Sequence, residues 1–324
     1  MVYHVGPTSQ RAVKRFFLLV TAGLVAAGAL FVLFLLRDPR PHFEHRRSEL
    51  AHVEERVPVV AGTALIQSVR LTATSGLSVE VGIRRELADT ARRLPAMVVL
   101  GGHFTGAEAA RLVGTTPGVV VAAMSYPFDG NPRPSAATFL RQIPRIRGAF
   151  LDTPPALMLV ADYLSRRADV DTTRIEAVGV SLGAPFVTIA ASLDARFSRV
   201  WALHGSGGSY APLEASMRRT IGFGPLRALS AGIANVIISG PRLAPEHWVA
   251  SIAPRPFIMV NAEEDERLPR AAVEALYAGA LEPKEQIWMS GGHVHGDAPT
   301  IERLVAIVLS RVTADAAQAA SGGT

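Results

Sequence analysis

Ser181 stands in the middle of the sequence G-V-S-L-G at positions 179–183, a pattern of residue types that can support nucleophilic catalysis. A strand-like run, Arg174 to Val180, precedes the serine, and apolar residues at 184–191 predict a helix after it. A strand that passes at once into a helix needs a sharp turn, in which the hydroxyl is pushed outward and glycines avoid side-chain collisions. The backbone N–H of Leu182 would then face the position where a carbonyl oxygen gains negative charge. This context predicts a nucleophile, and an ordinary strand-to-helix turn is the alternative.

Asp265 is the predicted acid that would serve this nucleophile. A serine needs a base within hydrogen-bond reach and an acid that holds the base in the right tautomer. The apolar run 257–260 predicts a strand, and the acidic loop 263–266 follows it directly. We expect the glutamates of this loop, Glu263, Glu264 and Glu266, to be solvated charges, with Glu264 as the nearest substitute for Asp265.

His293 is the predicted base. It follows the glycine pair 291–292, which comes directly after a strand-like run at 286–289 and lets the chain turn back over the edge of a sheet. The chain order of serine, acid and histidine is the order that a parallel sheet with a nucleophile on such a turn requires. His295 is the alternative base, and the remaining interpretation makes both histidines surface loop residues.

A second backbone amide is needed to stabilise an oxyanion, and the loop 101–106 can supply it after the apolar run 96–100. By position, the amide of His103 is the expected donor, and that of Phe104 is the next candidate. The side chain of His103 could simply line the pocket. The same holds for His204, which ends the strand-like run 199–203 and is a candidate substrate-binding residue.

Apolar runs and helical segments alternate along most of the chain. Alternating apolar and polar residues around Ser75-Gly76 first predict an antiparallel hairpin. The order strand, helix, strand then predicts a mostly parallel sheet with helices on both faces. The alternation stops within 205–250, where short helical pieces predict an insertion that could cap the site. The predicted strands lie at 64–73, 77–85, 96–100, 119–124, 174–180, 199–203, 257–260 and 286–289, and the predicted helices near 106–113, 136–167 with breaks at Pro144 and Pro154-Pro155, 184–191 and 301–314.

These segments together resemble the α/β-hydrolase superfamily, in particular esterases similar to dienelactone hydrolase and acetyl xylan esterase. The resemblance covers about residues 61–316 and implies a carboxylic ester hydrolase that acts on a small-molecule ester or acyl substrate without a cofactor or metal. The turn G-V-S-L-G-A also looks like that of acyl-CoA thioesterases and acyltransferases related to bile-acid conjugation. The motifs that carry the resemblance are G-V-S-L-G at 179–183, A-E-E-D-E-R-L-P at 262–269, G-G-H at 291–293 and G-G-H-F-T-G at 101–106.

Two positions depart from the pattern of these families. Gly101-Gly102 stands where a His-Gly pair is usual, and Ala262 stands where a glycine is often found three residues before the acid. Neither change removes a catalytic group, but both weaken the transfer of a substrate from any one family.

Composition excludes several other classes. The chain has 324 residues, 49% of them hydrophobic, enough for one large core. It has no cysteine, which excludes thiol nucleophiles, disulfides and thiolate zinc sites. The formal net charge is +5, and the basic residues are not interleaved with aromatic ones, so a nucleic-acid partner is not expected.

The uncharged run 16–36 predicts a membrane anchor. A helix of this length rises about 31 Å, enough to cross a hydrocarbon core. The alternative is a cleaved signal peptide, but the run ends without a small-x-small cleavage site. The tail before the run has no acidic residue, which favours an extracytoplasmic catalytic domain. The predicted segments are a tail at 1–15, the anchor at 16–36, a juxtamembrane linker at 37–60 with a short helix near 44–55, the hydrolase domain at 61–316 and a disordered tail at 317–324.

Two functions of other classes remain open. His293-x-His295-x-Asp297 has the spacing of metal ligands, although the further histidines that such metal hydrolases need downstream are missing. A non-catalytic scaffold of the same fold, used for binding, would require the loss of a catalytic group, yet the serine, acid and base all stand in suitable places.

Overall fold

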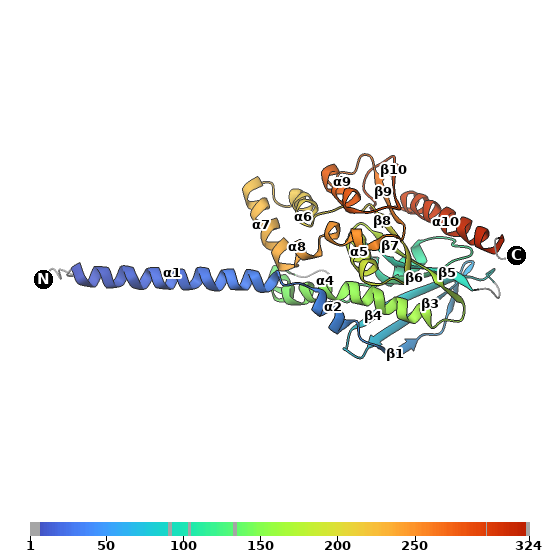
Figure 1. Cartoon of the computed structure of the whole chain (residues 1–324), viewed down its shortest axis with the longest axis horizontal. Coiled ribbons are helices and arrows are strands. Elements are labelled where there is room, and N and C mark those ends of the chain that lie inside the picture. The colour runs from blue at the N-terminus through green and yellow to red at the C-terminus, as the bar shows by residue number, and fades with distance from the viewer. Residues whose placement is uncertain (1–6, 90–92, 103–104, 132–134, 296, 322–324) are drawn as a thin grey trace. The chain divides into compact units, whose positions relative to one another are not determined.

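The computed structural model of the chain describes residues 7–89, 93–102, 105–131, 135–295 and 297–321 (Figure 1). The chain forms two units, Met1–Asp38 and Pro39–Thr324. The first unit contains helix α1, Pro7–Leu35. Within the described residues, its segment Lys14–Leu35 is the one helix long and apolar enough to cross a membrane, with a mean hydropathy of 2.6. A signal sequence near an N-terminus can meet the same criteria of length and apolar composition.

The second unit is built on one mixed sheet. Its strands, among the described residues, are β1 Leu50–Glu55, β2 Val59–Ala61, β3 Ala64–Ala73, β4 Ser78–Glu86, β5 Leu94–Leu100, β6 Val120–Met124, β7 Val170–Val180, β8 Phe197–Leu203, β9 Phe257–Ala262 and β10 Lys284–Met289. Its helices are α2 Arg40–Arg46, η1 Gly106–Glu108, α3 Ala109–Leu112, α4 Ala136–Ser165, α5 Gly183–Leu193, α6 Tyr210–Ser216, η2 Met217–Arg219, α7 Gly224–Ile237, α8 Gly240–Leu243, η3 Pro245–His247, η4 Val249–Ile252, α9 Arg270–Gly279 and α10 Ala298–Ser321.

The strand order fixes where a ligand can bind. The strands pair in the order β1-β3-β4-β6-β5-β7-β8-β9-β10, with β2 on the edge of β3. The pairs from β1 to β6 are antiparallel, and the pairs from β6 to β10 are parallel. After β5 the chain crosses to one side to form β6 and then returns to the other side to form β7. Open α/β sheets bind ligands beyond the carboxyl ends of the strands at such a reversal. The sheet therefore predicts a site beyond β5 and β7.

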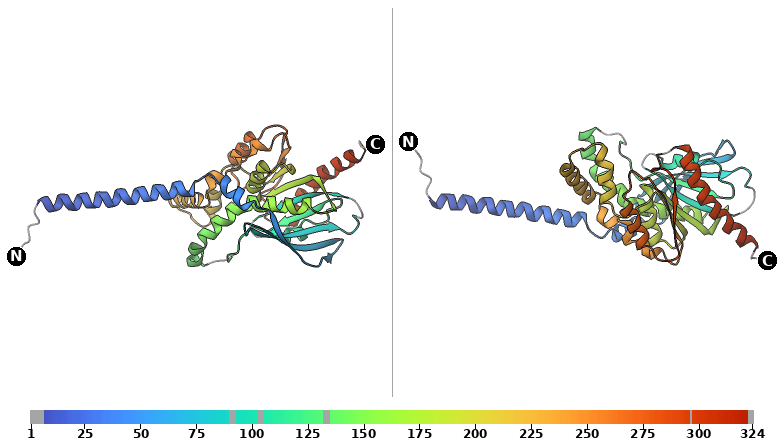
Figure 2. Two further views of the ribbon diagram at one scale, coloured as in Figure 1. Left: turned by 60° about the horizontal axis from the view of Figure 1, so that its bottom comes forward. Right: turned by 90° about the horizontal axis from the view of Figure 1, so that it is seen from above.

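Helices cover both faces of the parallel strands (Figure 2). Side chains alternate between the faces along each strand. In β5, Ala96, Val98 and Leu100 pack with α4 and α5, whereas Met97 and Val99 point to the face that α3 and α10 cover. The predicted mostly parallel sheet with helices on both faces is therefore observed.

Residues 40–55 differ from the predicted linker with a helix near 44–55. They form helix α2 and strand β1, and they belong to the second compact unit. Phe43 and Leu50 are 2% and 6% exposed, and β1 pairs with β3 in a register that joins Leu50 to Ala73. Burial of two large apolar side chains and pairing with a sheet edge explain the difference.

Two helices differ from the prediction. Helix α4 continues through Pro144, Pro154 and Pro155, where breaks were expected. Its buried residues 156–161 pack against the sheet, and this burial outweighs the hydrogen bonds that proline removes. Helix α10 continues to Ser321. Residues 317–321, which were expected to be disordered, are therefore helical. The segment is rich in alanine, the strongest helix former.

The predicted insertion at 205–250 is a set of short helices, α6 to η4, between β8 and β9. Helix α7 and the residue before it expose four large apolar side chains at helical spacing, Phe223, Leu226, Leu229 and Ile233. Each of them is more than half exposed. The insertion therefore presents an apolar surface to its surroundings.

Candidate active site

Ser181 lies in a tight turn between β7 and α5. Its φ angle is 53°, a left-handed conformation that a residue with a side chain rarely adopts. A Cβ atom at Gly179 would lie 2.6 Å from Cα of Ala184, and one at Gly183 would collide with the carbonyl oxygen of Leu100. Glycine is therefore required on both sides, and the backbone holds the serine in a conformation that projects its hydroxyl beyond the strand ends.

The structure brings Ser181, His293 and Asp265 together. The hydroxyl oxygen of Ser181 lies 2.8 Å from Nε2 of His293, and Nδ1 of His293 lies 2.8 Å from Oδ2 of Asp265. The other oxygen of Asp265 accepts hydrogen bonds from the backbone N–H groups of Arg267 and Leu268, at 2.9 and 2.8 Å. The serine follows β7, the aspartate follows β9 and the histidine follows β10. The carboxyl ends of these parallel strands meet at one edge, which is why residues far apart in sequence come into contact.

The carboxyl group of Asp265 is held as a carboxylate. Burial would raise its pKa, but hydrogen bonds from His204, His293 and the backbone of Leu268 outweigh burial and lower the pKa far below its usual range. An ionised acceptor keeps a proton on Nδ1 of His293 and leaves the lone pair of Nε2 facing the serine.

Glu266 and Glu264 accept hydrogen bonds from the loop that contains His293. They are therefore not simply the solvated loop charges that were expected. One oxygen of Glu266 accepts from the backbone N–H of His293 at 3.0 Å, and the other lies 2.7 Å from Nε2 of His295. Glu264 accepts from the backbone N–H of Gly291 at 2.9 Å. These contacts fix the backbone around His293, whereas the ring of His295 is exposed and pairs with Glu266.

His204 is a second histidine on the same carboxylate. Its side chain is fully buried, and its Nδ1 lies 3.4 Å from Oδ2 of Asp265 and 3.3 Å from the backbone nitrogen of Val294. Its ring meets the ring of His293 edge to face, with centroids 5.3 Å apart. His204 therefore lies beneath the Asp265–His293 pair. It is not among the described residues that line the two pockets meeting at Leu182, so its candidate role in substrate binding stays a prediction.

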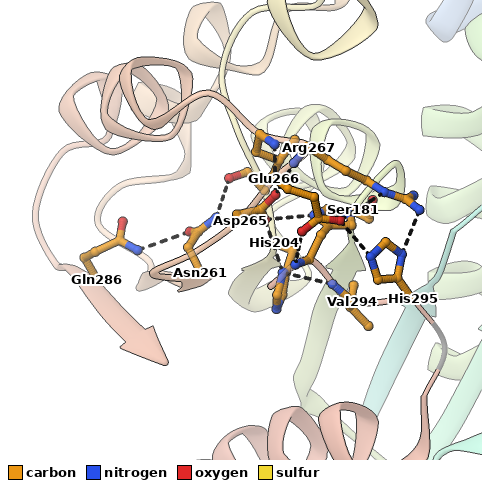
Figure 3. A network of polar contacts seen from close by, with 12 residues as sticks. Ser181, His204, Asn261, Asp265, Glu266, Arg267, Gln286, Val294 and His295 are labelled. Carbon is orange, nitrogen blue, oxygen red and sulfur yellow. Dashed lines mark hydrogen bonds and ion pairs between the residues drawn. The ribbon is translucent and has the colours of Figure 1, made fainter. Parts of the chain in front are cut away.

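Asn261 is a buried polar residue of β9 that the sequence reasoning missed. Its side-chain amide donates to the carbonyl oxygen of Gly205 at 2.9 Å, and its oxygen accepts from Gln286 at 3.1 Å (Figure 3). This chain of hydrogen bonds holds the backbone directly after His204. A polar residue in the apolar run F-I-M-V-N-A was the available signal, because buried polar side chains need partners.

The predicted oxyanion hole is described only in part. The backbone N–H of Leu182 lies at the start of α5, where the first N–H groups have no acceptor within the helix. His103 and Phe104, the candidates for the second amide, lie outside the described residues. The hydroxyl of Tyr126 donates to the carbonyl oxygen of Gly101, and that of Thr105 donates to the carbonyl oxygen of Gly102, both at 2.9 Å. The flanks of this loop are therefore anchored beside the serine.

Two pockets meet at Leu182. The larger, about 490 Å³, also touches Ser181 and continues between the sheet and helices α3 and α10. The smaller, about 370 Å³, shares Thr105 and Leu182 with it and includes the polar residues Glu80 and Ser125. Among the described residues, none from the insertion 205–250 lines either pocket, so a lid function of the insertion stays a prediction.

The geometry of the site also bears on the metal-binding alternative. Within the described part of the chain, the ligand atoms of His204, Asp265 and His293 lie within 4.8 Å of one another, whereas the predicted set of His293, His295 and Asp297 is not among such groups. Both ring nitrogens of His293 already have hydrogen-bond partners, namely Ser181 and Asp265. The observed contacts therefore fit proton transfer to the histidine better than ligation of a metal by it.

Known structures share this architecture. The acetyl xylan esterase from Paenibacillus sp. R4 superposes with a TM-score of 0.62, over 87% of this chain and 94% of that chain, at 16% identity. The chain has the α/β-hydrolase fold. The acetyl xylan esterase 1 from Thermoanaerobacterium sp. JW/SL YS485 is also similar, with a TM-score of 0.57 over 83% of this chain and 93% of that chain, at 15% identity. The predicted α/β-hydrolase fold is therefore confirmed.

Similarity to known proteins is weaker in sequence than in structure. No protein-family profile matches the chain. The uncharacterized protein YfhR of Salmonella typhi is 30% identical over 161 residues, which are 48% of this chain and 50% of that protein. The match spans about half the length of that relative.

Proposed function

We propose that this α/β hydrolase is a serine hydrolase that cleaves a carboxylic ester through an acyl-enzyme intermediate. The observation that carries the proposal is the continuous hydrogen-bonded series from the hydroxyl of Ser181 through both nitrogens of His293 to the carboxylate of Asp265. A serine needs such a base to become a nucleophile at neutral pH. The similarity of the fold to acetyl xylan esterases agrees with ester chemistry.

The reaction follows from these contacts. The Ser181 oxygen attacks the ester carbonyl carbon as its proton passes to Nε2 of His293, and the electron pair of the C=O bond moves to the oxygen. Two backbone N–H groups stabilise this oxyanion, that of Leu182 and a second one. His103 is the expected source of the second N–H group, and Phe104 is the next candidate. The electron pair on the oxyanion then re-forms the C=O bond, the C–O bond to the alcohol breaks, and the alcohol oxygen takes the proton from His293. Water repeats the sequence on the acyl-enzyme, releasing the acid and restoring the serine.

A fluorophosphonate probe and a panel of p-nitrophenyl esters test the proposal. The wild-type protein should be labelled and should hydrolyse at least the acetate ester. Ser181→Ala should lose labelling and reduce kcat by several orders of magnitude, up to about 10⁶-fold. Ser310→Ala is the matched control, because Ser310 is exposed on α10 and bonds only to the carbonyl oxygen of Ile307 among the described contacts. Labelling of Ser181→Ala at the wild-type level would refute the assignment.

We also propose that residues 16–36 anchor the enzyme in a membrane, with the catalytic unit on the extracytoplasmic side. The length and hydropathy of Lys14–Leu35 support the anchor. The exposed apolar surface of α7 suits a domain that is held next to lipid. The orientation rests on the tail before the run, which contains Arg11, Lys14 and Arg15 and no acidic residue.

Fractionation tests the anchor. The full-length protein should stay in the membrane pellet after a carbonate wash, and added protease should digest the catalytic unit in intact spheroplasts. A full-length protein in the soluble fraction, or a mature form that begins after residue 36, would contradict the anchor. Protection from protease would reverse the orientation.

A further inference from the structure

The larger pocket lies on one face of the sheet and follows the direction of the strands. Its sheet wall is made by Met97 and Val99 of β5 and by Val178 and Val180 of β7. These residues alternate along their strands, so their side chains share the face that α3 and α10 cover. The pocket therefore occupies space that core side chains would ordinarily fill, and protein interiors contain few voids larger than a water molecule.

The pocket is deep. It begins at Ser181, and Met97 lies in its wall opposite Glu176 in the register of β5 and β7. Glu176 is five residues before the serine, so the pocket reaches about 16 Å down the strands from the nucleophile. A hollow of this length suits an extended chain.

The chemistry of the wall is aliphatic. Helix α10 contributes Ile301, Leu304, Val305 and Val308, which recur at helical spacing on one face. Polar side chains occur near the opening, where Arg267 and His295 lie 2.7 Å apart through Nη2 and Nδ1. Thr116 is the polar residue beyond α3, and its backbone N–H is already bound to Glu86 at 3.0 Å. The hydroxyl of Thr116 lies 3.5 Å from the same carboxylate, and the hydroxyl of Thr105 donates to the carbonyl oxygen of Gly102 at 2.9 Å. Among the described residues of the wall below Ser181, the threonine donors therefore already have acceptors, which favours an apolar ligand.

We propose that this cavity receives a linear alkyl chain of medium length that belongs to the ester substrate. The inference rests on the proposed ester hydrolysis and names its substrate class. The chain is the acyl part or the alcohol part of the ester, and both share the same apolar chemistry. Burial of each methylene group that fits should raise kcat/KM about fourfold, provided that the transition state buries it as well.

The inference is tested with two series of esters and with variants whose larger side chains fill the cavity. The first series runs from p-nitrophenyl acetate through butanoate and octanoate to dodecanoate, and the second from ethyl to octyl acetate. Val308→Phe places a larger side chain in the cavity from α10, and Val113→Phe does so from the opposite wall. Ala306→Phe is the matched control, because residue 306 is exposed on the same helix. Hydrolysis of p-nitrophenyl acetate reports whether each variant folds.

The expected result is a kcat/KM that rises with chain length in one of the two series. Val308→Phe should lower the rate on the octyl-length substrate about tenfold or more, the contribution of roughly two methylenes, and leave acetate within about twofold. A rise in the p-nitrophenyl series assigns the cavity to the acyl chain, and a rise in the alkyl acetate series assigns it to the alcohol. Equal rates at all lengths, or a length dependence that both filled variants keep, would overturn the inference. Ester hydrolysis that is absent even with acetate would refute the proposed function instead.

Discussion

The two faces of the sheet differ in how completely they are filled. On the face covered by α4 and α5, large side chains such as Phe186 and Leu157 are fully buried in a continuous core. On the face covered by α3 and α10, the core continues through Trp201 but leaves a cavity of about 490 Å³ below Ser181. The same strands supply alternate residues to both faces. One face is therefore closely packed, whereas the other leaves the space in which we propose that part of the substrate binds.

The proposed chemistry sits above the second face, so changes there should affect activity more than stability. His293→Ala should lower kcat about 10⁴-fold or more, because the serine loses its base. The free energy of unfolding should fall by only about 1–3 kcal/mol, because the Asp265 carboxylate loses one of its hydrogen-bond donors. His295→Ala is the matched control. Its ring is exposed and pairs with Glu266, so its loss should change kcat less than about tenfold.

Steady-state kinetics and thermal unfolding of both variants measure this difference. Near-normal turnover of His293→Ala beside an inactive His295→Ala would transfer the role of base to His295. Activity that is lost on dialysis against a chelator and regained with zinc would favour the metal-dependent alternative.

A matched pair of leucines compares the two faces directly. Leu157→Ala on α4 should lower the free energy of unfolding by about 3–5 kcal/mol, since a fully packed side chain leaves a new void. Leu304→Ala on α10 should cost closer to about 2 kcal/mol, because Leu304 already faces the cavity and loses fewer contacts. Urea unfolding measures both values. Equal losses would mean that the cavity face is packed as tightly as the other.

Asp265 should contribute both to catalysis and to the stability of the folded protein. Its pKa is lowered in the folded protein, so its ionised form stabilises the fold above the unfolded pKa of about 3.9, and this contribution is lost as the pH falls through the folded value. Asp265→Asn should therefore be less stable at pH 7 by about 1–3 kcal/mol, and the difference should shrink below about pH 4. Urea unfolding of both proteins across this range tests the sign. A difference that is constant with pH would show that the folded pKa is not lowered.

The sequence was sufficient for the elements whose signals are local. Continuous apolar runs predicted the parallel strands, and the glycines around Ser181 predicted its turn. The placement of Asp265 and His293 beside it followed from the rule that parallel strands end at one edge, although the catalytic roles remain predictions. Strand β1 was missed because its sequence, L-A-H-V-E-E, has little strand character of its own and is stabilised by pairing with β3.

Long-range contacts explain what else was missed. Nothing near His204 in sequence indicates that it lies under Asp265, and the roles of Glu266 and Asn261 depend on loops that meet only in the folded chain. The cavity is harder still to predict. The apolar spacing of α10 shows which side of the helix faces the sheet, but it does not report how far from the sheet the helix lies.

Helix α10 comes after the last strand of the sheet, whereas the serine, acid and histidine all precede it in the chain. The outer wall of the cavity and the reactive groups are therefore encoded in separate stretches of the gene. Point mutations in the codons for α10 can widen or narrow the cavity below Ser181. The surroundings of Ser181, Asp265 and His293 would stay the same. Substrate range could drift quickly among relatives that share the same reaction, and a library limited to the inward residues of α10 should yield variants with new preferences at a low rate of inactive proteins.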